Sequence, residues 1–496
     1  MRFRAHERFH LMGIGGAGMS ALAELLLAEG YEVSGCDAAP GEFAAGLEAR
    51  GVRIARGHAA EHVAGTHTLV VSSAIPRDHR EVEAARAADV PVVRRAELLA
   101  EVARGRLQVA IAGTHGKSTT TTLTGCALTA AGFDPTVVVG GAVRGSGGNV
   151  RWGRGEPFVV EADEFDRSFL TLAPVYALVT SVDADHMDTY GSMRALGAAF
   201  VQFLDRVPFH GRAFWCADHA GLRRLVRRSR APLTSYGLSP RACVRGSRIR
   251  QRGLVTEFRL SRGGEGIGSI TLGLPGRLNV QNAVGAAALA LELGAGFEAI
   301  RTGLAECAGV TRRFEVKPCG SDVIVVDDYA HHPAEIRATL RAAREGWSRR
   351  LIALFQPHLF TRTRDLATEL GAALTAADVV LVTDVYPSRE APLPGVTGEL
   401  VAAAARGAGH ADVTYVQNLS ELATRTLERV RTGDLVVAMG AGDIGNVAGE
   451  IAAALAANAG DDGPDEARAQ TGASIHHDGD APAVALGSRR TEGVAC

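Results

Sequence analysis

The amino-acid sequence predicts an α/β protein made of three domains in series. Short apolar runs that resemble buried strands alternate with helical segments along most of the chain, which is the pattern of mainly parallel sheets. A length of 496 residues also suits roughly three domains at about 150 residues each. We expect the domains to cover residues 1–106, 107–315 and 316–458. The remainder, 459–496, is rich in Gly, Asp, Ala and Ser and is expected to be a disordered tail.

The first domain is expected to be Rossmann-like. Its strands are predicted at residues 9–12, 31–37, 68–73 and 90–93. A glycine-rich turn at 13–18 follows the first strand, and an Ala- and Leu-rich helix then runs to about Gly30. The turn has the spacing G-x-G-x-x-G, and Asp37 lies close to the usual distance for a ribose contact. A lone match of this kind favours a nucleotide diphosphate, with NAD or a simple packing turn left open.

The central domain is expected to resemble a P-loop ATPase. A predicted strand at 108–112 leads into a loop made of Gly113, Thr114, His115, Gly116, Lys117, Ser118 and Thr119. The glycines let backbone N–H groups approach phosphate oxygens, and the Ser118 hydroxyl can bind Mg²⁺. The chain has only two lysines, Lys117 and Lys317, so a lysine at this point indicates a point charge for phosphate. We therefore expect ATP and Mg²⁺ as cofactors.

Two acidic segments follow predicted strands of the central domain. The first is 161–166, where Glu161 comes directly off an apolar strand and Glu164 is the second choice as a metal ligand. The second is 183–188, which contains His186. Because the carboxyl ends of parallel strands meet at one edge of a sheet, both segments should face the phosphate loop. Farther along, residues 241–274 look antiparallel.

The third domain repeats the α/β alternation. Its strands are predicted at 323–328, 351–355, 379–383 and 434–439. The segments 327–333 and 356–365 carry His and Arg near strand ends, which indicates anion recognition or proton handling. A third glycine loop at 440–445 has no acidic residue at ribose distance, so a packing turn is favoured there.

Composition limits the class of protein. A net charge of −2 gives no electrostatic sign of nucleic-acid or membrane binding. The seven cysteines are scattered without a C-x-x-C pair, which favours reduced thiols and argues against a zinc site. The N-terminus lacks the apolar segment of a signal peptide, and no apolar stretch is long enough for a membrane helix. We expect a cytoplasmic protein, monomeric or homodimeric, without membrane insertion.

Taken together, these motifs resemble those of the Mur ligase family. The resemblance runs from about residue 9 to residue 448, with its motifs in the family's order. They lie at 13–20, 113–120, 160–166, 185–190, 327–333, 356–365 and 440–445. The family implies a first domain that binds the UDP of a sugar nucleotide, a central domain for ATP and Mg²⁺, and a third domain that closes over ATP and holds the amino acid.

The resemblance also implies roles for individual residues. The expected UDP-N-acetylmuramate contacts are Gly15, Gly16, Ala17, Gly18, Met19, Ser20, Asp37, Ser72 and Ser73. ATP would be bound by the loop from Gly113 to Thr119, by Asn282, Arg313 and Asp328, and the metal by Ser118, Glu161 and His186. The L-alanine contacts would be Tyr329, His331, His358 and Arg362, and the catalytic residues Lys117, Arg313 and His331. Leu359 stands where many relatives have arginine.

The implied activity is the ATP-dependent joining of L-alanine to the lactyl carboxylate of UDP-N-acetylmuramate through an acyl phosphate, in peptidoglycan precursor synthesis. Within the family, the alternative is a recycling ligase that attaches a tripeptide to the same sugar nucleotide. Two alternatives of other classes are an NAD-dependent dehydrogenase built on residues 13–37 and a non-catalytic nucleotide switch. The two acidic segments and the histidines of the third domain disfavour the switch.

Overall fold

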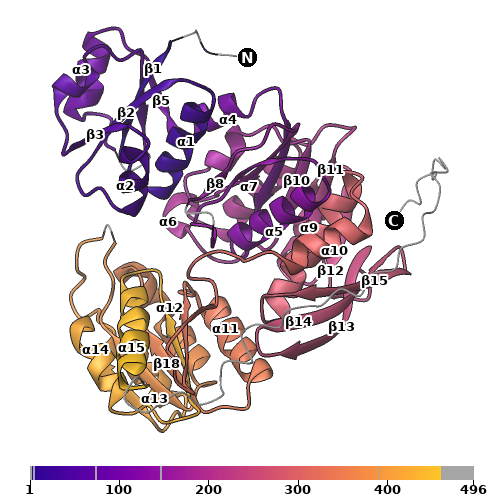
Figure 1. Cartoon of the computed structure of the whole chain (residues 1–496), viewed down its shortest axis with the longest axis vertical. Coiled ribbons are helices and arrows are strands. Elements are labelled where there is room, and N and C mark those ends of the chain that lie inside the picture. The colour runs from indigo at the N-terminus through magenta and orange to yellow at the C-terminus, as the bar shows by residue number, and fades with distance from the viewer. Residues whose placement is uncertain (1–2, 4–5, 73–74, 146–147, 389, 460–496) are drawn as a thin grey trace. The chain divides into compact units, whose positions relative to one another are not determined.

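The computed structural model describes residues 3, 6–72, 75–145, 148–388 and 390–459 (Figure 1). The expected tail therefore lies outside the described residues, apart from Ala459. The chain divides into two compact units, Met1–Arg313 and Phe314–Cys496, and each is described by itself. Over the described ranges, no helix is long and apolar enough to cross a membrane.

The first unit begins with a five-stranded parallel sheet in the order β3-β2-β1-β4-β5. Its strands are β1 (Arg8–Met12), β2 (Glu32–Asp37), β3 (Arg53–Arg56), β4 (Thr68–Val71) and β5 (Val92–Arg94). The connecting helices are α1 (Ala17–Ala28), α2 (Glu42–Glu48), η1 (Ala60–Val63), α3 (Arg80–Ala87) and α4 (Arg95–Val102). Four of the five residues of β1 are buried, as expected for a strand covered on both faces. The Rossmann-like prediction is confirmed, and β3 is a strand that the sequence pattern did not reveal.

A ten-stranded sheet forms the centre of the first unit, in the order β15-β14-β13-β12-β11-β10-β6-β9-β7-β8. The strands around its middle are parallel: β6 (Leu107–Ala112), β7 (Thr136–Val138), β9 (Pro157–Glu161), β10 (Tyr176–Val179), β11 (Arg212–Cys216) and β12 (Leu233–Gly237). Antiparallel pairs complete its two ends. At one end β8 (Val150–Arg151) pairs with β7, and at the other β13 (Val244–Arg252), which is parallel to β12, begins an antiparallel series with β14 (Val255–Arg262) and β15 (Glu265–Leu272). The antiparallel prediction for residues 241–274 is confirmed.

The helices of this central part are α5 (Lys117–Ala130), α6 (Met187–Tyr190), α7 (Met193–Leu204), α8 (Ala220–Leu225), α9 (Arg277–Glu292) and α10 (Phe297–Ala305), with short turns η2 (Ser168–Thr171) and η3 (Val226–Arg228). Helix α5 packs against α9 and α10 (Figure 1). The approach of α10 is close, because a Cβ added at Gly303 would lie 2.5 Å from the carbonyl oxygen of Cys126 on α5. A β-carbon at position 303 would therefore push the two helices apart.

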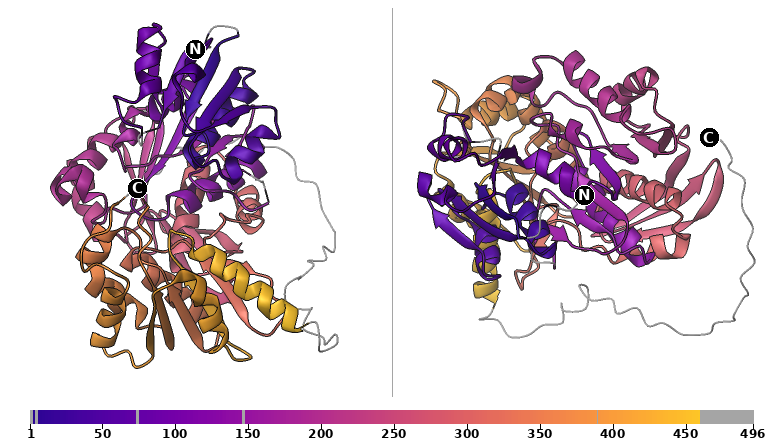
Figure 2. Two further views of the ribbon diagram at one scale, coloured as in Figure 1. Left: turned by 90° about the vertical axis from the view of Figure 1, so that its left-hand side faces the viewer. Right: turned by 90° about the horizontal axis from the view of Figure 1, so that it is seen from above.

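The second unit holds a six-stranded sheet in the order β16-β17-β21-β18-β19-β20. Its strands are β16 (Glu315–Lys317), β17 (Ile324–Asp328), β18 (Leu351–Phe355), β19 (Val379–Thr383), β20 (Val413–Val416) and β21 (Leu435–Met439). Its helices are α11 (Pro333–Gly346), α12 (Phe360–Leu374), α13 (Glu399–Gly407), α14 (Leu419–Leu427) and α15 (Ile444–Ala459), which Figure 2 shows from two further sides. All pairs are parallel except β16 with β17. The three-domain α/β prediction is thus confirmed, with β16 and β20 as additional strands.

The strand order of the central sheet determines which candidate site residues lie close together. Strands β10, β6 and β9 are neighbours and run parallel. Their carboxyl ends therefore lie at one edge of the sheet, as expected for an α/β sheet. The phosphate-type loop follows β6, Glu161 ends β9, and Thr180 follows β10. Segments far apart in sequence thus come together through strand order.

Candidate active site

The loop between β6 and α5 has the backbone that a phosphate site requires. Gly113 and Gly116 have φ angles of +131° and +79°, which side-chain-bearing residues rarely adopt. The loop is fixed from outside: the Thr114 amide donates to the carbonyl of Ser181, and the His115 amide donates to the Ser181 hydroxyl, both at 3.0 Å. Helix α5 begins at Lys117, so its N-terminal N–H groups and dipole favour an anion at this loop.

Lys117 is held between a carbonyl and a carboxylate. Its Nζ donates to the carbonyl of Gly113 and to Glu164 Oε2, both at 2.8 Å, and lies 3.9 Å from Asp163 Oδ1. Burial by itself would lower the pKa of Lys117, but Glu164, Asp163 and Glu161 raise it well above its usual range. The ammonium therefore stays charged at neutral pH and can neutralise phosphate.

Ser118 and Glu161 form a pair of oxygen donors next to this lysine. Ser118 Oγ donates to Glu161 Oε1 at 3.0 Å, and the Gly140 amide donates to Glu161 Oε2 at 2.6 Å. The second bond holds the carboxylate in one orientation. A hydroxyl and a carboxylate at this distance are the kind of oxygen ligands that Mg²⁺ binds, together with water and phosphate.

A further acidic group includes the histidine expected to bind metal. His186, Asp163 and Glu164 each place one possible ligand atom within 4.8 Å of the others. The Glu164 side chain is 1% exposed, and burial raises its pKa despite the nearby Lys117 ammonium. Its Oε1 is buried and accepts no hydrogen bond from the described residues. A buried carboxylate oxygen without a donor suits a cation, so these side chains fit Mg²⁺. The sequence ranked Glu164 second, whereas the structure gives it contacts to both Lys117 and the His186 group.

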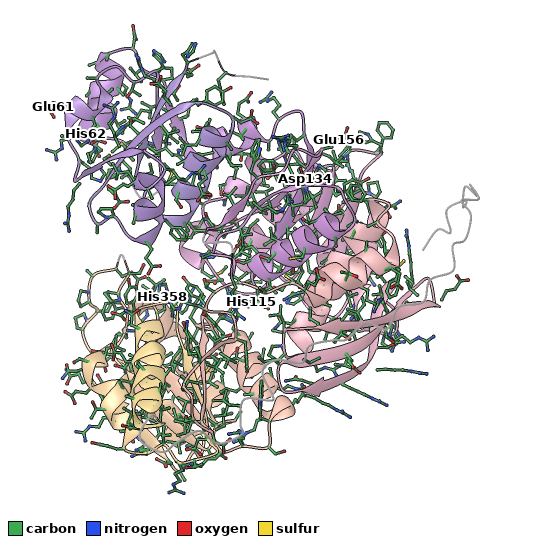
Figure 3. The ribbon with its side chains drawn as sticks, in the orientation of Figure 1. Glu61, His62, His115, Asp134, Glu156 and His358 are labelled. Carbon is green, nitrogen blue, oxygen red and sulfur yellow. The ribbon has the colours of Figure 1, made fainter. Side chains whose placement is uncertain are left out.

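Sequence reasoning missed a histidine–aspartate–histidine group beside the loop. Asp183 Oδ2 lies 3.2 Å from His115 Nε2, and its Oδ1 lies 3.0 Å from His219 Nε2 (Figure 3 labels His115). Hydrogen bonds from His115 and then His219 lower the pKa of Asp183 far below its ordinary value. The Asp183 amide also donates to Thr114 Oγ1 at 3.0 Å. The group holds the phosphate loop in place; His115 and Asp183 lay in segments that the sequence singled out, whereas His219 did not.

Asn282 lies against the same loop. A Cβ added at Gly116 would be only 2.6 Å from Asn282 Oδ1, so the asparagine packs directly onto this glycine. Asn282 is buried in α9, and its Nδ2 lies 3.4 Å from Asn279 Oδ1. The structure therefore places an amide next to the phosphate loop. Thr119, in the first turn of α5, is buried.

The first glycine loop opens onto a cavity of about 270 Å³. Its lining includes the predicted residues Gly16, Ala17, Gly18, Met19 and Ser72, and also Glu161, Asp163 and Arg95. One cavity thus joins the expected sugar-nucleotide loop to the acidic edge of the central sheet. The two parts are tied together by Asn149, whose Nδ2 donates to the carbonyl of Ala17 at 2.6 Å.

Two other predicted contacts, Asp37 and Ser20, form bonds within the glycine loop and its helix. Asp37 Oδ2 accepts the Gly15 amide at 2.9 Å, so this carboxylate shapes the glycine loop. Ser20 is fully buried and its hydroxyl donates to the Ala17 carbonyl at 3.0 Å. Ser73 lies outside the described residues. Arg95, at the start of α4, was not predicted, although the Arg94-Arg95 doublet at a helix start is a signal for anion binding.

In the second unit, Asp328 organises the end of β17. Its Oδ2 accepts the Phe314 amide at 2.7 Å, while its Oδ1 accepts the Ala330 amide at 2.9 Å and the Thr339 hydroxyl at 3.2 Å. Its carboxylate is buried in these contacts and shapes the turn that carries Tyr329 and His331. Arg313, expected to reach ATP, is the last residue of the first unit, and its carbonyl accepts from Arg144 Nη2 at 2.5 Å.

The predicted amino-acid contacts form a continuous row of side chains. The ring centroids of Tyr329 and His331 are 5.5 Å apart, and those of His331 and His358 are 5.6 Å apart. Arg362 Nη1 lies 3.3 Å from His358 Nδ1. Tyr386, which the sequence did not reveal, stacks on His358 at 5.8 Å. The structure thus brings together all four residues expected to hold L-alanine (Figure 3 labels His358).

The turn that carries His358 is unusual in its backbone. Leu359 has a φ angle of +69° at the start of α12, and its amide donates to the Tyr386 carbonyl at 3.0 Å. With ψ at 134°, Leu359 lies in a sparsely populated region of backbone space, which costs of order 1–3 kcal/mol. The third glycine loop packs nearby, since a Cβ at Gly442 would lie 2.5 Å from both Gln356 Oε1 and Tyr386 Cγ. This loop serves close packing, as its sequence indicated.

Three family models cover most of the chain. The Mur ligase catalytic domain matches residues 8–107, the Mur ligase middle domain matches 111–290, and the Mur ligase glutamate ligase domain matches 312–442. The chain belongs to the Mur ligase family, which confirms the resemblance found in the sequence.

The comparison with individual proteins is more specific than the match to the family models. The chain is 47% identical over 455 residues to the UDP-N-acetylmuramate--L-alanine ligase of Laribacter hongkongensis (strain HLHK9), covering 90% of this chain and 97% of the relative. The solved UDP-N-acetylmuramate-alanine ligase from Thermotoga maritima is 27% identical with a TM-score of 0.77, covering 90% of this chain and 98% of that one. A murein peptide ligase from Psychrobacter arcticus shares the fold at 24% identity and a TM-score of 0.67, covering 91% and 99%.

Proposed function

We propose that this chain joins L-alanine to the lactyl carboxylate of UDP-N-acetylmuramate, with cleavage of ATP to ADP and phosphate, in peptidoglycan precursor synthesis. The observation that carries this proposal is the position of Glu161. It contacts Ser118 beside the phosphate loop and also lines the cavity of the first glycine loop. An acid bound in that cavity would therefore lie close to the γ-phosphate of a bound triphosphate. The relative from Laribacter hongkongensis is named for this reaction.

The reaction needs two steps because a carboxylate is a poor electrophile. First, a lactyl carboxylate oxygen attacks the γ-phosphorus of ATP, the bond to the β,γ-bridging oxygen breaks, and ADP leaves. Then the neutral amine of L-alanine attacks the acyl carbon of the acyl phosphate, loses a proton, and expels phosphate as the amide forms. Lys117 stabilises negative charge that develops on the transferred phosphoryl group.

Ser118, Glu161, Glu164 and His186 are the residues proposed to hold magnesium. When bound, Mg²⁺ would neutralise phosphate charge in the transfer step. The chain's own residues do the remaining work. The Gly113–Thr119 loop would orient the phosphates, Asn282 is proposed to contact the nucleotide base, and Arg313 is proposed to reach the γ-phosphate. The second unit supplies Asp328, and the row from Tyr329 to Arg362 is proposed to bind L-alanine and to exclude water.

The alternatives have less support. Membership in the Mur ligase family favours a ligase over a dehydrogenase, and Asp37 is engaged by the Gly15 amide of its own loop. Two murein peptide ligases of known structure are 24% and 26% identical to this chain, whereas the relative named for L-alanine is 47% identical. We therefore favour L-alanine as the acceptor.

The test is a phosphate-release assay with purified full-length chain, ATP, Mg²⁺ and UDP-N-acetylmuramate. Acceptors would be L-alanine, glycine, L-serine and the tripeptide of peptidoglycan recycling, and products would be identified by mass spectrometry. We expect the highest kcat/KM with L-alanine and one phosphate released per amide formed. Faster turnover with the tripeptide would favour the recycling ligase. Amide formation without ATP cleavage would refute the mechanism.

A further inference from the structure

A second group of possible metal ligands lies within the N-terminal sheet domain. His10 on β1, Cys36 on β2, His62 on η1 and Glu81 on α3 each place one ligand atom within 4.8 Å of the others. His10, Cys36 and Glu81 are 3%, 0% and 0% exposed, so these polar side chains lie inside the domain (Figure 3 labels His62). None of them has a part in the reaction proposed above.

One ring nitrogen of His10 has no partner in this group. Its Nδ1 lies 2.9 Å from Ser34 Oγ, and the Ser34 hydroxyl donates to the carbonyl of Phe9 at 3.5 Å. Nε2 is buried with no hydrogen-bond partner among the described residues. A histidine that binds a metal through one ring nitrogen commonly has its other ring nitrogen hydrogen-bonded to a second group, as Nδ1 is here.

The carboxylate and the thiol already contact the other members of the group. Glu81 Oε1 lies 2.8 Å from His62 Nδ1, and Glu81 Oε2 lies 3.2 Å from Cys36 Sγ. The Ala59 amide donates to Glu81 Oε1 at 2.7 Å and holds the carboxylate in place. His58 Nδ1 is 3.2 Å from Cys36 Sγ and flanks the group. A fully buried glutamate among thiol and imidazole groups is costly unless a positive charge balances it.

We propose that His10 Nε2, Cys36 Sγ, His62 Nδ1 and Glu81 bind one Zn²⁺ as a closed structural site. Two imidazoles, one thiolate and one carboxylate are all common zinc ligands, and four protein ligands are the rule for structural zinc. A tetrahedron with metal–ligand bonds of about 2.1 Å has edges of roughly 3.4 Å. Contacts of 2.8 Å and 3.2 Å already lie near that edge, and no pair exceeds 4.8 Å.

The ion would add a shared ligand centre to four elements that already contact one another through the β1–β2 ladder and the bonds of Glu81. It would link β1 and β2 of the sheet to η1 and α3, which come from later in the sequence. Binding converts the Cys36 thiol to a thiolate and releases one proton, since the thiolate is the form of cysteine that binds a metal. The absence of C-x-x-C pairs argued against zinc in the sequence, but this site uses a single cysteine and the fold gathers its partners. The inference is independent of the proposed ligase reaction.

The test uses the chelator-treated full-length chain with Co²⁺ in place of Zn²⁺, because a cobalt–thiolate bond gives a charge-transfer band in the near ultraviolet. We expect this band in the wild type, its loss on addition of one equivalent of Zn²⁺, and a Zn²⁺-dependent rise in Tm. Cys36→Ser should lose both the band and the rise in Tm, with folding checked by far-UV circular dichroism. His10→Gln, which keeps the thiol, should weaken Zn²⁺ binding in competition with a chromophoric chelator by about 10-fold or more.

Two control variants test whether the cobalt band arises from a different thiol or from the other metal group. Cys216→Ser removes a buried thiol of the central sheet, and His186→Ala removes a ligand of the other metal group. Both should keep the band. A wild type without the band, or a band that persists in Cys36→Ser, would overturn the proposal. If Cys36→Ser does not fold, a Zn²⁺ affinity unchanged in His10→Gln would do the same.

Discussion

Lys117 Nζ donates to Glu164 Oε2 at 2.8 Å, although these residues come from different strand ends of the central sheet. The same Glu164 offers its second oxygen to the group that contains His186. One buried carboxylate therefore connects the phosphate-binding lysine to the proposed metal ligands. The following predictions test the parts of this arrangement and of the sites around it.

Replacing the loop lysine tests the phosphate assignment. We expect Lys117→Ala to lower kcat by about 100-fold or more, because it removes a preorganised charge from the phosphoryl group in the transition state. Binding of UDP-N-acetylmuramate, measured by calorimetry, should stay nearly unchanged. Lys317→Ala is a matched control, since Lys317 is the only other lysine and pairs with Glu315 in the second unit. Near-normal turnover of Lys117→Ala would contradict the assignment.

Substitutions at Ser118 test the metal assignment. We expect Ser118→Ala to raise the Mg²⁺ concentration needed for half-maximal activity, because the hydroxyl ligand is lost. Ser118→Thr keeps the hydroxyl and should restore the wild-type Mg²⁺ dependence. The measurement is phosphate release as a function of Mg²⁺ at saturating ATP. An equal Mg²⁺ requirement in all three proteins would exclude Ser118 as a ligand.

Substitution of Arg95 tests whether the cavity of the first glycine loop binds UDP-N-acetylmuramate. We expect Arg95→Ala to raise the KM for UDP-N-acetylmuramate by about 10-fold or more with a smaller effect on kcat, since charge-assisted hydrogen bonds contribute roughly 1.5–3 kcal/mol. Arg94→Ala is the control, because Arg94 is exposed and does not line the cavity. Steady-state kinetics at saturating ATP and L-alanine would separate KM from kcat. If both variants behaved alike, a specific role of Arg95 would be refuted.

Substitution of Arg362 tests the proposed binding site for L-alanine. We expect Arg362→Ala to raise the KM for L-alanine by about 10- to 100-fold, because the amino-acid carboxylate loses a charged donor. The KM for ATP should change little. Arg364→Ala, two residues later, removes an exposed arginine that pairs with Asp365 and serves as the control. An unchanged KM for L-alanine would place its carboxylate elsewhere.

The Asp183 carboxylate makes the folding stability of the chain depend on pH in the acid range. Its folded-state pKa lies below the ordinary value of 3.8, because of hydrogen bonds from His115 and His219. The unfolded state therefore binds the proton more readily, and the carboxylate's contribution is complete above that ordinary value and lost as the pH falls toward the folded-state pKa. We expect the wild type to have a higher Tm than Asp183→Asn at about pH 5.5, and the difference to shrink by about pH 3. Thermal unfolding followed by circular dichroism measures this, and a Tm difference independent of pH would contradict it.

Local patterns were sufficient for much of this description. The glycine spacing at 113–116, followed by a rare lysine and a hydroxyl, marked the phosphate loop without any knowledge of the fold. Apolar runs located the central strands, because strands buried on both faces have few polar residues. Short strands with mixed composition, such as β3 and β20, escaped notice since their periodicity is weak.

The sequence by itself determined the kind of chemistry: the loop residues, the acids that end apolar strands and the family to which the chain belongs. Only the tertiary structure decided which of these side chains meet. Strand order places β10, β6 and β9 side by side, so that Glu164 reaches Lys117 from 47 positions away. Packing likewise gathers His10, Cys36, His62 and Glu81, which have no common spacing in the chain. The physical reason is that spacing encodes contacts within one helix or strand, whereas contacts between elements follow from how their buried faces pack.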